Sequence, residues 1–235
     1  MASLYEQLMK DVRMQEGLNS CMSCGTCTAI CPAASFYKYE PRSIAMKVQS
    51  QNEETLKDLL KSEEIWYCGE CMSCKTRCPR GNAPGLIIMA LRSLSQDLGY
   101  FMESEKGRQQ LFLKRTIGQW LIDHGYCLYL KGIGTDLYPE QGPVWDWIQA
   151  NYDKLFAKLG ANYQKEGIGI LRKIPESSIN ELKNIYQITG AMDRLEKIEN
   201  LAQQFADKQN GEQDNNQEKY FHKIYEETDI NHFRV

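Results

Sequence analysis

The stretches CMSCGTCTAICP at residues 21–32 and CGECMSCKTRCP at residues 68–79 decide how this chain folds. Both have the pattern C-x2-C-x2-C-x3-C-P, so the sequence contains an internal repeat of four cysteines followed by a proline. The two runs hold eight of the nine cysteines, and the ninth is Cys127. Thiols grouped at this spacing predict two metal-binding loops joined by residues 32–67.

Three thiolates within seven residues can surround three corners of an iron–sulfur cubane, and the fourth cysteine then points elsewhere. In two-cluster ferredoxins it binds the other cluster. We therefore expect two 4Fe–4S clusters. The ligands expected for one cluster are Cys21, Cys24, Cys27 and Cys78, and those for the other are Cys31, Cys68, Cys71 and Cys74.

Structural zinc is the alternative use of these cysteines. Zinc favours C-x2-C pairs that supply two ligands each, and the third cysteine at the same spacing would have no role in such a site. Clusters whose irons are all bound by cysteine conduct electrons and leave no iron open to substrate. We therefore expect a non-catalytic electron-transfer protein with no catalytic residue.

Composition excludes several classes of protein. The chain has 235 residues, of which 42% are hydrophobic, and 28 Lys and Arg against 31 Asp and Glu give a net charge of −3. This balance argues against binding to nucleic acid or to an anionic membrane surface. The longest stretch free of charged and of strongly polar residues, residues 83–91, is too short to span a bilayer. We expect a soluble cytoplasmic protein without a secretory signal, because a secreted disulfide scaffold would be shorter and richer in cysteine.

Periodicity predicts a mainly α fold with almost no strand pattern. In the first domain, residues 1–100, the capping box Ser3-x-x-Glu6 starts a helix with Leu4, Leu8 and Val12 on one face, and Gly17 ends it. Further helices are expected to start at Pro41, at Asn52 and at Pro84, the last ending at Gly99.

A helical extension is expected at residues 101–206, with a long glycine-containing loop at 123–142. Residues 104–122 are expected to be helical with Leu111, Ile117 and Leu121 inward. The helix after Pro143 should bury one face, and further helices should follow Pro175 and Gly190. The apolar face after Pro143 consists of Val144, Ile148, Tyr152, Leu155 and Leu159. Residues 207–235 begin with a polar, low-complexity segment that predicts a disordered or docking tail.

Several residues outside the ligand set have two interpretations. Cys127 has apolar neighbours and is expected to be a small buried residue. Trp66 and Tyr67 would shield the cluster of the second run or simply pack. The cations Lys75, Arg77 and Arg80 also have two interpretations. They would raise the reduction potential of that cluster, or they would be solvated charges on a turn.

Two further groups lie outside the repeat. The three histidines do not have the spacing of a metal site, so we expect all of them at the surface. They are His124, His222 and His232. Five aromatic residues would suit burial against a partner, with a place in the core as the competing explanation. They are Tyr126, Tyr129, Tyr138, Trp145 and Trp147.

The doubled cysteine run, the helical insert and the helical continuation resemble the C subunit of heterodisulfide reductase over about residues 1–160. The insert also resembles the α-helical ferredoxin domain of succinate dehydrogenase and anaerobic glycerol-3-phosphate dehydrogenase iron–sulfur subunits. The first of these relatives would carry a plant-type 2Fe–2S domain before residue 21. The second would carry CCG motifs after Cys78, and this chain has no Cys-Cys pair there.

This resemblance implies electron transfer between a flavin-containing subunit and another subunit whose CCG domains handle a disulfide or sulfur substrate. The residues beyond Gly160 extend past the archetypal methanogen protein and look more like bacterial heterodisulfide-reductase-like complexes, some of which serve sulfur oxidation. The alternatives are a stand-alone two-cluster ferredoxin and an iron–sulfur subunit of another dehydrogenase complex.

Anaerobically purified protein should contain about eight iron and eight acid-labile sulfide per chain, because each cysteine run fits three corners of a cubane. Metal analysis and sulfide determination on the same sample test this. Stoichiometric zinc with no sulfide would contradict it.

Overall fold

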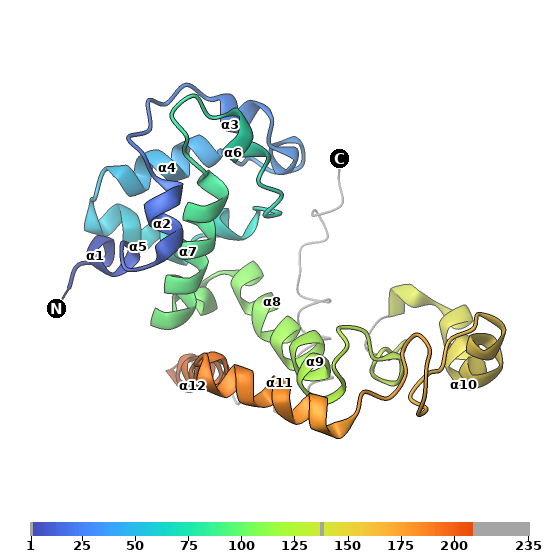
Figure 1. Cartoon of the computed structure of the whole chain (residues 1–235). Helices are drawn as coiled ribbons and strands as arrows, with labels where there is room; N and C mark the ends of the chain where they lie inside the picture. Colours follow the sequence, from blue (N-terminus) through green and yellow to red (C-terminus); the bar gives the residue numbers. More distant parts are fainter. Residues whose placement is uncertain (1, 137–138, 209–235) are drawn as a thin grey trace. The chain divides into compact units, whose positions relative to one another are not determined.

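The computed structural model describes residues 2–136 and 139–208, which form two compact units divided after Arg108 (Figure 1). The described residues are mainly helical, as the periodicity predicts, and contain no β-strand beyond one isolated bridge between Ala161 and Ile170. None of the described helices is both long enough and apolar enough to cross a bilayer.

The first unit consists of short helices connected by tight loops. They are α1 (Leu4–Leu8), α2 (Val12–Gly17), α3 (Thr26–Ala29), η1 (Pro32–Ser35), α4 (Pro41–Gln49), α5 (Glu53–Lys61), η2 (Glu64–Trp66), α6 (Ser73–Arg77), α7 (Pro84–Leu98) and η3 (Tyr100–Glu103). The next helix, α8 (Glu105–Leu113), begins in this unit and ends in the second.

The first predicted helix is divided in two. The capping box at Ser3 starts α1 as predicted, but the carboxylate of Asp11 accepts a hydrogen bond from the backbone N–H of Arg13 and starts a second helix, α2. Leu4 and Leu8 are buried, whereas Val12 is 72% exposed. The expected apolar face is therefore wrong at Val12, because the new helix start rotates it away from the core.

Helix α7 is the centre of the first unit, in contact with α1, α2, α4, α5 and α6 (Figure 1). Its side chains Ile87, Ile88 and Leu91 are completely buried. A Cβ added to Gly17 would lie 3.0 Å from Cγ1 of Ile87, so the end of α2 rests directly on α7. The hydroxyl of Ser95 donates to the carbonyl of Leu60 at 2.7 Å, which ties α7 to α5.

In the second unit, α11 packs against both α9 and α12. Each of these three helices buries an isoleucine: Ile122 in α9, Ile179 in α11 and Ile198 in α12. Burial raises the pKa of Glu199, but its bonds to Arg115 and Lys114 together outweigh burial and leave the pKa below its usual value. The elements are η4 (a π-helix, Lys114–Gly118), α9 (Gln119–His124), η5 (Leu130–Gly132), η6 (Pro139–Gln141), α10 (Pro143–Lys158), α11 (Glu176–Ile188) and α12 (Ala191–Lys208).

Some details of the extension differ from the sequence expectations. Ile117 is 39% exposed rather than inward, and Val144 and Leu159 on α10 are 68% and 66% exposed. Helix α10 bends at Asn151, where φ is −123°, so its apolar residues do not form one continuous buried face. Helix α12 continues through Lys208, and the rest of the expected tail lies outside the described residues.

Replacing Leu91 with alanine should lower the free energy of unfolding by about 2–5 kcal/mol, because it empties a fully buried position in the central helix. The Val12→Ala variant, at a site 72% exposed, is the matched control and should change it by about 0.5 kcal/mol or less. Anaerobic denaturant titration measures both. Equal effects of the two variants would show that α7 is not the centre of the core.

Candidate metal centre

Two pockets in the first unit are lined by the eight cysteines of the repeat. The first site contains Cys21, Cys24, Cys27 and Cys78, and its lining also includes Arg42, Arg80 and Asn82. The second site contains Cys31, Cys68, Cys71 and Cys74, and its lining also includes Phe36, Tyr39, Tyr67 and Ile88. The fourth cysteine of each run therefore lies with the first three cysteines of the other run.

The backbone repeats the symmetry of the sequence. The residue before the second cysteine of each run has a positive φ, 58° at Ser23 and 54° at Glu70. The residue after it does too, 83° at Gly25 and 57° at Met72. These left-handed residues curl each run around its own pocket, and a short helix, α3 or α6, begins directly afterwards.

The exchange of the fourth cysteine follows from the end of these short helices. Cys31 has φ −75° and ψ 118°, and Cys78 has φ −75° and ψ 120°. A following proline disfavours helical backbone at both positions, so each cysteine is extended and leaves its own run. Because α3 packs against α6, the departing cysteine reaches the neighbouring site.

Each run has a hydroxyl group beside its second cysteine. The Cys24 sulfur lies 3.4 Å from Oγ1 of Thr26, and the Cys71 sulfur lies 3.4 Å from Oγ of Ser73. These hydrogen bonds are the main cause that lowers the pKa of each thiol, which favours the thiolate that metals bind. Both hydroxyls directly precede the third cysteine in the sequence, a signal that the spacing of cysteines alone does not include.

The third cysteine of each run is less exposed. Burial raises the pKa of the Cys27 and Cys74 thiols, so both favour the neutral form until a metal compensates for the lost solvation. A Cβ added to Gly85 would lie 3.0 Å from Sδ of Met72 and 3.7 Å from Sγ of Cys74. Glycine therefore allows the start of α7 to approach the second site closely.

Asn82 connects the two runs and touches a ligand. Its side-chain amide accepts from the backbone N–H of Asn19 and donates to the Asn19 carbonyl at 3.0 Å. The same amide nitrogen lies 3.7 Å from the Cys78 sulfur. Asn82 is only 2% exposed, so it holds the beginning of the first run beside the end of the second.

Two other side chains fix the loops to the helical core. Gln49 of α4 accepts from the backbone N–H of Cys21 and donates to its carbonyl. Arg92 of α7 donates to the carbonyls of Ile65 and Cys68, both at 2.6 Å, and to the carboxylate of Glu70 at 2.5 Å. These residues lie far from the runs in sequence, so the cysteine motif gave no indication of them.

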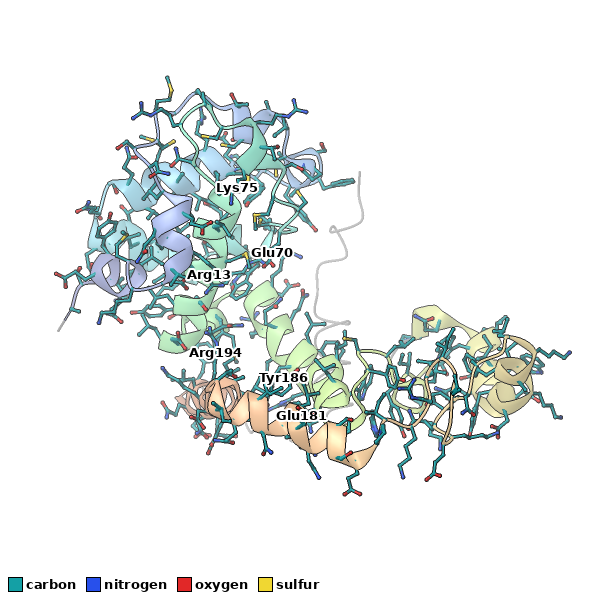
Figure 2. All side chains as sticks on the ribbon, in the orientation of Figure 1. Arg13, Glu70, Lys75, Glu181, Tyr186 and Arg194 are labelled. Atoms are coloured by element: carbon teal, nitrogen blue, oxygen red, sulfur yellow. The ribbon has the colours of Figure 1, made fainter. Side chains whose placement is uncertain are left out.

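The structure changes the interpretation of the cations near the second run. Arg80 lines the first site and is absent from the lining of the second, although it follows the second run in sequence. Arg80 lies two residues after Cys78, and because Cys78 lines the first site, Arg80 lies there too. Lys75, labelled in Figure 2, is 52% exposed and pairs with Glu16 at 3.4 Å, as the solvated interpretation describes.

The aromatic residues before Cys68 have different positions. Tyr67 lines the second site and stacks on Tyr37 with ring centroids 4.3 Å apart. Lys106 lies over both rings, 5.5 Å and 5.8 Å from their centroids. Trp66 is buried against Arg92 and is absent from the lining of either site, which agrees with packing rather than direct shielding.

Cys127 is exposed, so the expectation of a buried thiol is wrong; its loop turns it outward despite the apolar neighbours in sequence. His124 is half-buried and stacks on Tyr129 at 3.9 Å. His222 and His232 lie outside the described residues.

The aromatic residues proposed for docking divide between surface and packing. Trp147 is 59% exposed, whereas the Trp145 indole donates to the carbonyl of Ile133 and is partly buried. Tyr126 and Tyr129 are half-buried, and Tyr138 lies outside the described residues.

The donor set of each site fits an iron–sulfur cluster. Each pocket presents four thiols and is lined by no histidine or carboxylate. Three thiols from one run and one from the other at each site match the ligand set of the clusters in two-cluster ferredoxins.

Replacing Cys31 with serine should damage the cluster at the second site and leave the first intact, because Cys31 lies among Cys68, Cys71 and Cys74. EPR of the reduced protein should match that of Cys71→Ser and differ from that of Cys24→Ser. Cys127→Ser, which changes an exposed cysteine outside both pockets, is the control. Loss of the same signal in Cys31→Ser and Cys24→Ser would reverse the ligand assignment.

Comparison with known proteins agrees with this geometry. Residues 14–82 match the family model described as a 4Fe-4S dicluster domain, which identifies the centre as a 4Fe–4S centre. The chain is 31% identical over 205 residues to the C subunit of ferredoxin:CoB-CoM heterodisulfide reductase from Methanosarcina acetivorans, covering 86% of this chain and 75% of that protein. An alignment of this length extends past residue 160, so the expected limit of the resemblance is wrong. With this identity and coverage, the chain belongs to the family of iron–sulfur proteins formed by the C subunits of heterodisulfide reductase.

Proposed function

We propose that this chain relays electrons within a heterodisulfide-reductase-type complex, between a flavin-containing subunit and a CCG-domain subunit that handles a disulfide or sulfur substrate. The observation that carries the proposal is the lining of two pockets by four cysteines each, with one cysteine exchanged between the runs. The proposed ligands are Cys21, Cys24, Cys27 and Cys78 at the first site, and Cys31, Cys68, Cys71 and Cys74 at the second.

When bound, 4Fe–4S clusters supply reversible one-electron transfer. Four thiol donors at each site would occupy the protein-facing positions of a cubane, which suits relay rather than substrate binding. The chain contributes a rigid frame for this purpose. Asn82, Gln49 and Arg92 clamp the cysteine loops to the helical core, so the ligands move little when the charge of the site changes.

The two sites offer separate positions for partners. Met22, which lines the first site, is 62% exposed, and Phe36, which lines the second, is 69% exposed. Exposed apolar side chains beside a redox site favour contact with another protein, because burying them there brings the partner close to the ligands. One such residue at each site supports entry of electrons at one pocket and exit at the other.

The choice of substrate rests on the relative. The Methanosarcina acetivorans protein is named for the CoB-CoM heterodisulfide, and we extend to this chain a partner that acts on a disulfide of this kind. The residues beyond Gly160 are the basis for expecting a role in sulfur oxidation. Because the similarity to a methanogen protein extends past this residue, the extension does not favour sulfur oxidation over heterodisulfide chemistry.

Co-expression with a flavin subunit and a CCG-domain subunit should give a complex that is stable on size exclusion, and the isolated chain should turn over no disulfide or sulfur substrate. Reducing the flavin subunit should bleach the visible absorbance of this chain before the CCG-domain subunit is reduced. Stopped-flow absorbance measures the order. A stand-alone ferredoxin would instead remain monomeric and exchange electrons with many partners, and substrate turnover by the isolated chain would contradict a pure relay.

A matched pair of surface variants tests the docking positions within the same complex. Phe36→Ser should weaken binding of one partner about tenfold, the effect of a moderate interface hot spot. Val12→Ser removes an equally exposed apolar residue that lines neither pocket, and binding should be unchanged. Equal binding by both variants would show that the partner does not dock at the second site.

A further inference from the structure

Tyr39 is a buried side chain at the second site, outside its set of cysteines. It precedes the N-cap of α4 and lines this site, where it is 3% exposed. Its ring packs edge-on against Tyr67 with centroids 6.1 Å apart, so the ring alone has a clear packing function. The hydroxyl requires a separate explanation.

The Tyr39 hydroxyl is buried and makes no hydrogen bond of ordinary length within the described part of the chain, and a weaker hydrogen-bond interaction joins it to the Cys68 thiol. A buried hydroxyl without a partner costs free energy, and native structures rarely retain one unless something else satisfies it. A phenylalanine would fill the same space without this cost. The hydroxyl is therefore expected to have an acceptor that belongs to the group bound at the site.

The surroundings identify the chemistry of that acceptor. Four thiols line the second site, and two of them, Cys68 and Cys31, interact with the Tyr39 side chain. A phenol is protonated at neutral pH, so its hydroxyl acts as a donor. The groups nearest to it are ligands of the second site, so the available acceptors are sulfur atoms.

No equivalent tyrosine lines the first site. There the amide of Asn82 donates toward Cys78, and the lining includes the cations Arg42 and Arg80. The second site is lined mainly by apolar and aromatic side chains instead. A hydrogen bond from Tyr39 would consequently act on one site and not on the other.

We propose that the Tyr39 hydroxyl donates a hydrogen bond to a sulfur atom of the iron–sulfur group at the second site and raises the reduction potential of that group. This inference rests on the ligand assignment proposed above. Reduction adds negative charge to the group, and a donor aimed at its sulfur stabilises that charge, so the bond favours the reduced state. Tyr39 thus acts directly on the group at the second site, and the lining of the first site contains no tyrosine.

Removing only the hydroxyl tests the proposal. In the iron-loaded full-length protein, Tyr39→Phe should lower the midpoint potential of the cluster whose EPR signal is lost in Cys31→Ser. At a fixed potential the ratio of reduced to oxidised cluster should fall about tenfold, which corresponds to about 59 mV for one electron. The other cluster should keep its potential. EPR-monitored redox titration of the isolated protein measures both.

Tyr163→Phe is the control, because it removes another buried hydroxyl, in the second unit, from a residue that is absent from the lining of both pockets. It should change neither potential. Unchanged potentials in fully loaded Tyr39→Phe, or equal shifts at both clusters, would overturn the proposal. A protein that binds no iron would instead contradict the proposed function, so the two failures are distinguishable.

A second measurement does not depend on how the variant folds. Wild-type protein loaded with iron and sulfide in D2O should show an exchangeable deuteron strongly coupled to the reduced second cluster in electron–nuclear double resonance. Its absence from the wild-type spectrum would also overturn the proposal. Its loss in Tyr39→Phe, with iron content retained, would assign the deuteron to the phenol.

Discussion

The exchange of one cysteine between two runs is the constraint on which the first unit depends. Each pocket is lined by three cysteines from one run and a fourth from the other, so neither run forms a pocket alone. Helices α3 and α6 must therefore pack together, and the residues between the runs must bring the second run back beside the first. The helices α4 and α5 accomplish this return, and both pack against α7.

The frame around the cysteines is made mostly of polar clamps rather than additional core. Asn82 ties the start of the first run to the end of the second, Gln49 ties the first run to α4, and Arg92 ties the second run to α7. Each clamp bonds to backbone groups that a tight cysteine loop cannot satisfy internally. The same side chains thus satisfy the loops and limit the movement of the ligands.

Identical ligand types lie in different surroundings at the two sites. Arg42, Arg80 and Asn82 line the first site, whereas Phe36, Tyr39 and Tyr67 line the second. Charge, hydrogen bonding and burial tune iron–sulfur potentials, so this asymmetry provides a means for the protein to direct electrons between otherwise similar centres. The asymmetry arises from residues outside the repeat, because the repeat itself treats both sites alike.

The sequence by itself determined the type of centre, the mainly α fold and the family, because cysteine spacing and helical periodicity are local properties that survive without tertiary contacts. The helix starts at Ser3, Pro41, Asn52 and Pro84 were predicted from local capping rules and are present. Only the tertiary structure decided the direction of Arg80, the exposure of Cys127 and Val12, and the roles of Asn82, Arg92 and Tyr39. These depend on contacts between residues distant in sequence, such as Asn82 with Asn19 and Arg92 with Cys68, and no periodicity records such contacts. Arg80 shows the physical reason most clearly: it follows a cysteine that crosses to the other site, so its neighbours in space differ from its neighbours in sequence.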